Sequence, residues 1–338
     1  MKGARLAYLH VGIEKTGTTS IQSFLANNRE ALQRSGVAYP RSPGHANHIK
    51  LNAYAMNDDK IDDTRTRYDL KSASDIEPFR NAFRQQLHRE IRHLGSYDKF
   101  VFSNEHCSDR LTEPEEVNRL LDLLQPMFSN IKVVIYLREQ GANMVSSYST
   151  NLRNGSTRIP GPGFDRRKYD YYQRVKRWAD QVGRSSVDLR IYDRSEFVGG
   201  DLILDFLDAI EVEWRDEFYI PDRKNERIDA RSLEFLRRFN EVAPTLLSDS
   251  EAQAARAKIV RALENLTQGP TLAYPSDVLQ SVREASAESN ERLAREFFDR
   301  DDLFPTYDSS SSGRNEIERP ELTTSEILET IVRIAAEI

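Results

Sequence analysis

The sequence predicts an α/β fold with three layers, in which helices flank a central, mainly parallel sheet and a helical C-terminal region follows. Short apolar runs alternate with segments of helical periodicity through the first two thirds of the chain. This alternation is typical of parallel strands joined by crossover helices. From about Asp229 onward the apolar pattern is helical without clear strands. A glycine-containing turn directly follows the first apolar run, as expected where a strand leads into a helix.

Four short apolar segments are the main predicted strands, and each is flanked by helix-like sequence. They are Leu6 to Val11, Phe100 to Ser103, Val133 to Leu137 and Val187 to Tyr192, and a shorter strand is predicted at Val37 to Tyr39. Because a helical segment separates successive strands, we expect the strands to be parallel.

Two helices of the scaffold can be predicted from their periodicity. The segment 73–94 carries apolar residues every three or four positions, at Ile76, Phe79, Phe83, Leu87 and Ile91. This spacing marks one face of a helix. The segment 113–128 has the same character, and Thr112 with Glu115 resembles a capping box at its start.

The chain has 338 residues, which allows one large domain or two modest ones. We predict a single domain over 1–338, with an α/β core in residues 1–210 and a mainly helical part in residues 225–338.

Composition limits the classes of function. Hydrophobic residues make up 38% and charged residues 30%, as in water-soluble globular proteins. The net charge of -6 argues against broad binding of nucleic acid, which depends on clustered Lys and Arg, although a local basic pocket is compatible with it. The single cysteine, Cys107, cannot form an internal disulfide, and no set of zinc ligands is present. With no signal segment or apolar stretch of about 20 residues, a cytoplasmic protein is predicted.

The strongest motif is the segment from His10 to Thr19, which lies between the first strand and a helical segment at 20–32. Gly12 and Gly17 let successive backbone N–H groups point into one concavity, and the following helix adds the positive end of its dipole. These features predict a phosphate-binding loop. The alternative is an ordinary strand-to-helix turn with an exposed lysine.

The position of the lysine separates this loop from that of ATP-binding proteins. The two glycines have the spacing of a P-loop, but Thr18 stands where the ATP-binding version requires lysine. Lys15 lies inside the loop instead. An ammonium there would lie beside a terminal phosphate and its bridging oxygen, where negative charge grows when a group leaves.

The motif His10-x-Gly12-x-x-Lys15-Thr16-Gly17-Thr18-Thr19, followed by Ile21, Gln22 and Leu25, resembles the 5′-phosphosulfate loop of the sulfotransferases that use 3′-phosphoadenosine 5′-phosphosulfate (PAPS), including bacterial members. The resemblance extends from Tyr8 to about Phe206 and is diffuse beyond it. It implies a P-loop-like fold in which residues 1–210 bind PAPS and the product PAP. It also implies that Lys15 is catalytic and, with Thr16, Gly17, Thr18 and Thr19, holds the 5′-phosphate.

Arg138 follows a predicted strand, and Ser146 lies two helical turns later. The carboxyl edge of an α/β sheet is where ligands bind, and a guanidinium can hold a phosphate through two hydrogen bonds. The segment is similar to the 3′-phosphate motif of the same family, which implies that role for Arg138 and Ser146. A structural ion pair of Arg138 is the alternative.

Sulfuryl transfer needs a base near the acceptor hydroxyl. Glu105 and His106 follow the strand that ends at Ser103, and the family commonly has a carboxylate or histidine at a comparable place. We predict Glu105 as the base, with His106 as the alternative, and strand alternation would direct the two side chains differently. Glu105 could instead be a solvated ion-pair partner.

Further candidates rest on weaker signals. His45, Asn47 and His48 could line the acceptor pocket or be ordinary loop residues. The loops 41–71 and 154–168 are predicted to select the acceptor. Tyr192 could stack on adenine or be a buried aromatic residue. Arg223 and Lys224 resemble a late lid segment of the family.

The combined prediction is an enzyme that moves a sulfuryl group from PAPS, in line and without a metal, to an acceptor hydroxyl or amine. The acceptor would be a small molecule or a glycan, and the resemblance favours a saccharide or glycolipid. Two alternatives stay open: an ATP-dependent phosphotransferase, and a non-catalytic protein that binds a nucleotide.

Overall fold

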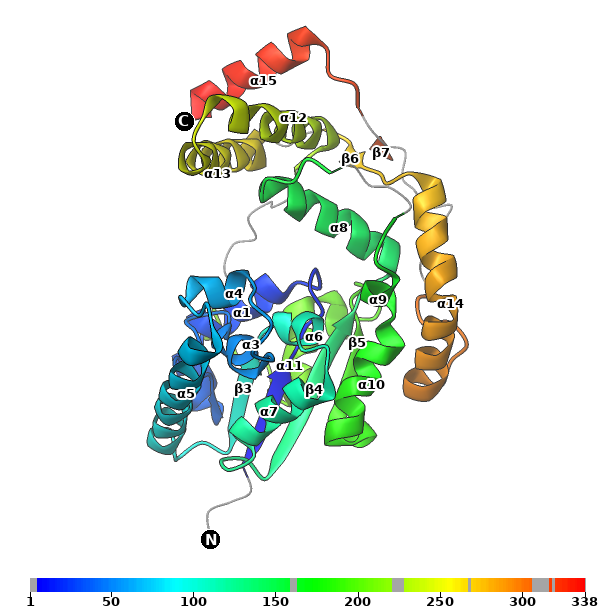
Figure 1. Ribbon diagram of the computed structural model, residues 1–338. Coiled ribbons are helices and arrows are strands. Elements are labelled where there is room, and N and C mark those ends of the chain that lie inside the picture. Colours follow the sequence, from blue (N-terminus) through cyan, green and yellow to red (C-terminus); the bar gives the residue numbers. More distant parts are fainter. Residues whose placement is uncertain are drawn as a thin grey trace. The chain divides into compact units, whose positions relative to one another are not determined.

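The computed structural model describes residues 5–158, 163–220, 228–266, 269–305, 316–317 and 320–337. The chain divides into two compact units, and Figure 1 labels their helices and strands. The first unit contains Met1–Arg138, Asp170–Pro221 and Ser289–Leu303, and the second contains Glu139–Tyr169, Asp222–Glu288 and Phe304–Ile338. The single domain expected over 1–338 stays a prediction.

The first unit is built on a parallel sheet of five strands in the order β2-β3-β1-β4-β5. The strands are β1 (Leu6–His10), β2 (Val37–Ala38), β3 (Lys99–Ser103), β4 (Asn130–Leu137) and β5 (Val187–Ile191). The five predicted strands and their parallel arrangement are therefore confirmed, with ends that differ by at most three residues.

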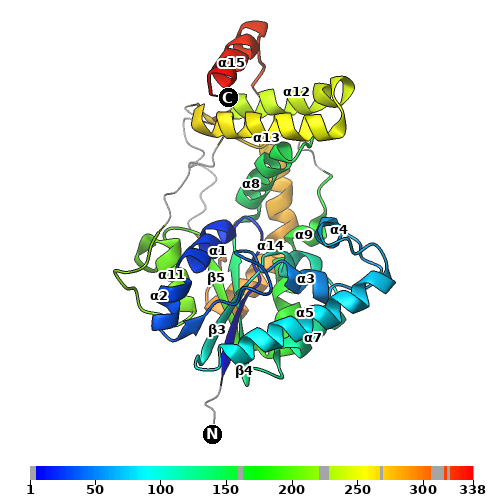
Figure 2. The ribbon, with the colours of Figure 1, turned by 90° about the vertical axis from the view of Figure 1, so that its left-hand side faces the viewer.

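Helices cover both faces of this sheet, which confirms the predicted three layers. Figure 2 shows α1 (Thr18–Asn27), α2 (Arg29–Arg34) and α11 (Leu202–Ala209) on one side and α3 (Lys50–Ala55), α5 (Ala73–His93) and α7 (Pro114–Leu124) on the other. On the first side, Tyr8, Val101 and Tyr136 of the strands pack with Phe24 of α1 and Phe206 of α11. The alternate strand residues, such as Leu9 and Phe102, are fully buried and point to the other side.

The helix predicted at 73–94 is confirmed as α5, and the helix predicted at 113–128 is the shorter α7. The capping box of α7 consists of Glu113 and Glu116, one residue after the predicted pair Thr112 and Glu115. Pro114 explains the difference, because proline is favoured at the first position of a helix and so makes Glu113 the cap.

Short elements complete the first unit. They are α4 (Asp63–Arg67), α6 (His106–Arg110), α10 (Tyr171–Val182), the 3₁₀ turns Arg184–Ser186 and Val198–Gly200, and the last part of α14 (Ser276–Phe298). α10 contacts α7 and β4, so it belongs to the same layer as α7.

The second unit is mainly helical. It contains α8 (Gln140–Arg153), α9 (Arg166–Tyr169), α12 (Ala230–Leu246), α13 (Asp249–Leu266), α15 (Thr324–Glu337) and the start of α14. Leu152, Leu233, Leu236, Leu263 and Ile334 form one of its cores. The helical C-terminal region expected from the sequence is confirmed, and it also contains one short pair of strands, β6 (Thr271–Leu272) with β7 (Glu316–Ile317). Strands of two residues are too short to produce a periodic pattern.

Among the described helices, none combines the length and the apolar composition that a membrane span requires.

Candidate functional site

The predicted phosphate loop follows β1, the central strand of the sheet. β3 lies on one side of β1 and β4 on the other, with β5 beyond β4. Because all these strands are parallel, the residues that follow them emerge at the same edge of the sheet as the loop. Ligands bind at this edge of open α/β sheets, where strand order reverses.

Three residues of the loop have positive φ angles, the kind of backbone conformation that can turn successive N–H groups to one side. Gly12, Lys15 and Gly17 have φ angles of 111°, 70° and 72°. Thr16 Oγ1 donates to the Ile13 carbonyl at 2.6 Å, which closes the turn, and α1 begins at Thr18. The first N–H groups of a helix have no acceptor within it and carry the positive end of its dipole. The loop therefore has the backbone angles and the following helix that the prediction requires, and phosphate binding itself stays a prediction.

Both glycines lie against neighbouring segments. A Cβ atom on Gly17 would lie 2.3 Å from Leu202 Cδ2 and 3.0 Å from Tyr192 Cε2. A Cβ atom on Gly12 would lie 2.9 Å from the Glu105 carbonyl oxygen. Glycine is thus required at both ends of the loop by its positive φ and by close packing.

Arg138 and Tyr192 lie against the loop from the side of β4 and β5. Arg138 Nη1 donates to the Lys15 carbonyl at 3.0 Å, and its guanidinium carbon lies 5.4 Å from the centre of the Tyr192 ring. Tyr171 Oη donates to the Arg138 carbonyl at 2.9 Å and so fixes its backbone. Within the described residues Arg138 forms no ion pair, and its half-buried guanidinium faces the loop that is predicted to bind the anion.

Glu105 lies on the opposite flank, just beyond β3. Its Oε2 accepts from Gln22 Nε2 at 2.6 Å and from Asn47 Nδ2 at 3.1 Å, and Oε1 accepts from Asn47 Nδ2 at 3.2 Å. The side chain is 14% exposed. Two amides from distant segments therefore hold this carboxylate at the sheet edge, where it remains accessible to a small substrate.

His106 lies between two carboxylates. Its Nδ1 is 2.8 Å from Glu14 Oε1, and its Nε2 is 4.0 Å from Glu105 Oε1. The expectation that Glu105 and His106 point in different directions is wrong. Strand alternation does not apply to them, because β3 ends at Ser103, Glu105 has helical backbone angles and α6 begins at His106.

Burial acts to lower the pKa of His106, but the hydrogen bond to Glu14 and the charge of Glu105 together outweigh it. The net result is a raised pKa, so His106 binds a proton more readily than an ordinary histidine.

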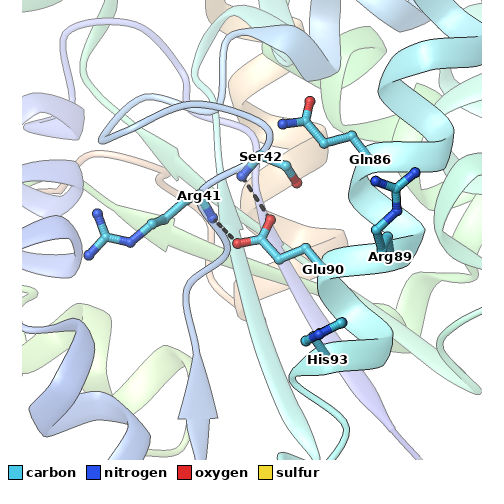
Figure 3. A pocket seen from close by; sticks show the side chains of 6 residues that line it. All are labelled: Arg41, Ser42, Gln86, Arg89, Glu90 and His93. Carbon is cyan, nitrogen blue, oxygen red and sulfur yellow. Dashed lines mark hydrogen bonds between the residues drawn. The ribbon is translucent and has the colours of Figure 1, made fainter.

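The loop after β2, which carries His45 and His48, is fixed by two charged side chains. Figure 3 shows that Glu90 of α5 accepts from the backbone N–H groups of Arg41 at 2.7 Å and Ser42 at 2.8 Å. Arg29 donates to the carbonyls of Tyr39 and His45. A cavity of about 400 Å³ is lined by the same three residues, Arg41, Ser42 and Glu90. Gln86, Arg89 and His93 of α5 complete its lining.

His45 is exposed, as a residue that contacts an acceptor would need to be. His48 is fully buried, and its Nε2 donates to the Pro40 carbonyl at 2.9 Å while Nδ1 accepts from the Ser103 N–H at 3.3 Å. Its ring also stacks on Tyr39, and burial lowers its pKa to about 3. The structure thus places His48 in the interior as a support of the loop, and not at the surface of a pocket.

Three features predicted from the sequence stay predictions. Ser146 lies on α8 of the second unit, and its role stays a prediction. Arg223 and Lys224 lie outside the described residues, as do residues 159–162 of the predicted acceptor loop 154–168. Among the residues that the structure describes, there is no group of three His, Cys, Asp or Glu side chains that could hold a metal ion.

Sequence reasoning missed the partners of the predicted residues. Gln22 was part of the motif without a role, Asn47 was a candidate for the acceptor pocket and not for contact with Glu105, and Glu14 was an unassigned position of the loop. A signal exists for Gln22, which lies one helical turn after Thr18 and so returns to the sheet edge. No local pattern identifies Glu14 or Asn47.

No protein-family model matches the chain. A curated relative, an uncharacterized protein from Archaeoglobus fulgidus, is 29% identical over 171 residues, which cover 49% of this chain and 46% of the relative. The match therefore spans less than half of the length of that relative.

Two solved structures resemble the chain. A sulfotransferase from Alicyclobacillus acidocaldarius has 14% identity and a TM-score of 0.38, and covers 78% of this chain and 97% of its own. The sulfotransferase domain from the curacin biosynthetic pathway has 12% identity and a TM-score of 0.36, and covers 84% of this chain and 98% of its own. Likeness at this level does not establish a family.

Proposed function

We propose that this chain transfers a sulfuryl group from PAPS to an acceptor hydroxyl or amine. The observation that carries the proposal is the phosphate loop at the end of the central strand, with Glu105 on one flank and Arg138 and Tyr192 on the other. One flank offers a base and the other offers a cation and an aromatic ring, and these are the groups that a transfer from an anionic nucleotide requires.

The residues of the site fit the donor. The positive φ angles of Gly12 and Gly17 would help to turn N–H groups of the loop toward a phosphate, and the start of α1 adds its dipole. Thr16, Thr18 and Thr19 would hold the 5′-phosphate with these N–H groups, and Arg138 would hold the 3′-phosphate. Tyr192 offers an aromatic face for the adenine.

Bound PAPS would supply the sulfuryl group together with a phosphate leaving group. Lys15 places a positive charge within the loop, where it would stabilise the negative charge that develops on the phosphate oxygen. Glu105 would accept the proton of the acceptor, which typically contributes 10² to 10⁴ in rate. Gln22 and Asn47 orient its carboxylate for this step.

For the acceptor we propose a saccharide or glycolipid hydroxyl. The support comes from the loop after β2, because Asn47 contacts Glu105 directly and His45, two residues before it, is exposed. A polar, exposed loop beside the base suits an acceptor that is rich in hydroxyl groups.

Binding and transfer test the proposal separately. Isothermal titration calorimetry should detect binding of PAP to the chain. The affinity for ATP with magnesium should be at least tenfold weaker than the affinity for PAP. Incubation with labelled PAPS and a panel of saccharides, followed by mass spectrometry, should show an added sulfate. Glu105→Gln should retain PAP binding and lose transfer, whereas near-normal rates would show that the base is another residue.

Two results would favour the alternatives. Preferential binding of ATP with magnesium would indicate a phosphotransferase. Tight binding of PAP without transfer to any acceptor, in the panel or in a cell extract, would indicate a non-catalytic protein.

A further inference from the structure

Glu14, His106 and Glu105 form a row of three ionisable side chains at the mouth of the site. Glu14 Oε1 and His106 Nδ1 are 2.8 Å apart, a normal hydrogen-bond distance. His106 Nε2 and Glu105 Oε1 are 4.0 Å apart, which is within reach of a bridging water or a small rotation of the ring. The two ring nitrogens thus face different carboxylates, Nδ1 toward Glu14 and Nε2 toward Glu105.

The backbone holds His106 in this place. Its N–H donates to Asn104 Oδ1 at 2.8 Å, and Asn104 is fully buried. Asn104 Nδ2 in turn donates to the His48 carbonyl at 2.9 Å and to Asn52 Oδ1 at 2.8 Å. The start of α6 is therefore anchored in the interior, and the direction of the imidazole depends mainly on its contact with Glu14.

The charges around His106 favour a proton on the ring. Glu14 faces it from the phosphate loop and Glu105 from its own segment, while Arg110 on α6 opposes them. Arg110 is itself paired with Asp62 and Asp63 at the start of α4, so part of its charge is balanced. Glu14 makes the direct hydrogen bond and is the main group that compensates for burial.

We propose that Glu14 is a positioning residue that holds His106 with Nε2 toward Glu105, so that His106 receives the proton which Glu105 takes from the acceptor. The inference rests on the proposed function. As the acceptor oxygen forms its bond to sulfur, its O–H bond breaks and the proton passes to a Glu105 oxygen. That O–H bond then breaks, an N–H bond forms at Nε2, and water removes the proton from the imidazolium before the next turnover.

The direction of the second transfer follows from ordinary basicity. An imidazole is in general a stronger base than a carboxylate, so the proton moves from Glu105 to His106. The negative charge of Glu14 strengthens this direction because it stabilises the imidazolium. Glu105 is thereby returned to the charged form that it needs as a base.

Glu14→Gln separates the charge of this residue from its geometry, because the amide oxygen can still accept the Nδ1–H. The His106 titration would be followed by NMR in the full chain with PAP bound, using ¹³C-labelled histidine and assigning the signal with His106→Asn. We expect the midpoint to fall by about one pH unit, a tenfold weaker affinity for the proton. Glu115→Gln, an exposed carboxylate on α7, is the matched control and should leave the midpoint unchanged.

The pH dependence of kcat is the second readout. His106 must be neutral to accept the proton, so activity should decline on the acid side with the midpoint of His106. In Glu14→Gln this decline should move to lower pH by the same amount, while the KM for PAPS stays within twofold. An unmoved His106 midpoint would show that Glu14 does not contact the ring in solution and would overturn the positioning role that depends on this contact. A moved midpoint with an unchanged kcat profile would overturn the proton transfer.

If the proposed function itself is wrong, the experiments should give a different set of results. In that case the unmodified chain would not bind PAP or would not transfer sulfate. The NMR comparison of the chain with and without Glu14→Gln, made in the absence of PAP, would still decide whether Glu14 controls His106.

Discussion

Gly17→Ala tests the close contact between the phosphate loop and the flank that carries Arg138. Gly17 has a φ of 72°, and an added Cβ would lie 2.3 Å from Leu202 Cδ2 and 3.0 Å from Tyr192 Cε2. The left-handed backbone costs an alanine about 1 to 2 kcal/mol. Overpacking against two packed side chains adds about 1 to 3 kcal/mol. The free energy of unfolding should therefore fall by about 2 to 5 kcal/mol.

Gly36→Ala provides the matched control for this substitution. Its φ is 79°, nearly that of Gly17, but no atom outside the two adjacent residues lies within 4 Å of an added Cβ. The backbone strain is then common to both variants, and their difference of about 1 to 3 kcal/mol isolates the packing of the loop. Gly17→Ala should also weaken PAP binding at least tenfold, whereas Gly36→Ala should not change it.

Urea denaturation followed by tryptophan fluorescence suits this comparison. Both tryptophans of the chain, Trp178 and Trp214, belong to the first unit, as do Gly17 and Gly36. Equal losses of stability in the two variants would refute the reasoning, because the loop would then have room for a side chain.

Three other predictions concern the same unit. Lys15→Ala should lower sulfate transfer by at least about 10² to 10³, measured with labelled PAPS, because it removes the charge proposed to stabilise the leaving oxygen; a smaller loss would contradict that role. Asn47→Ala should reduce kcat less than Glu105→Gln does and leave the calorimetric affinity for PAP unchanged; a loss of PAP affinity would show that Asn47 serves the nucleotide and not the base. Burial lowers the pKa of His10 and of His48 from 6.5 to about 3, so both are neutral in the folded chain, while the unfolded chain takes up a proton at each below about pH 6.5. Stability should therefore fall as the pH decreases from 6.5 toward 3, by up to about 1.4 kcal/mol per pH unit for each histidine, and urea titrations that give a constant free energy between pH 6.5 and 5 would contradict this.

The sheet could be predicted because its strands are buried on both faces. Such strands read as continuous apolar runs, so 100–103 and 133–137 stand out from the helices around them. β6 and β7 could not be predicted, because two residues that pair across a long separation leave no local pattern. The start of α7 was missed by one residue for a different reason, since two adjacent residues could both serve as its cap and Pro114 decided between them.

The positions of the site residues along the chain could be predicted, but their partners could not. Lys15, Glu105 and Arg138 each follow a predicted strand, and parallel strands bring such residues to one edge. The hydrogen bonds of Gln22 and Asn47 to Glu105 join residues that are 83 and 58 positions apart, so only the folded chain reveals them. His48 was predicted wrongly for a different reason. A histidine in a loop could contact an acceptor as far as the sequence shows, but the ring of His48 is fully buried.

The order of the strands explains why the proposed base and the proposed nucleotide anchors are separated. β3 and β4 lie on opposite sides of β1, so Glu105 and Arg138 approach the loop from opposite flanks. Gly12 contacts the segment of Glu105 and Gly17 contacts Tyr192, which means that the two ends of the loop are fixed by different neighbours. A substitution on one flank should therefore affect one function and spare the other. This is why kcat and PAP affinity, measured together on Asn47→Ala and Gly17→Ala, test the arrangement more sharply than either measurement does alone.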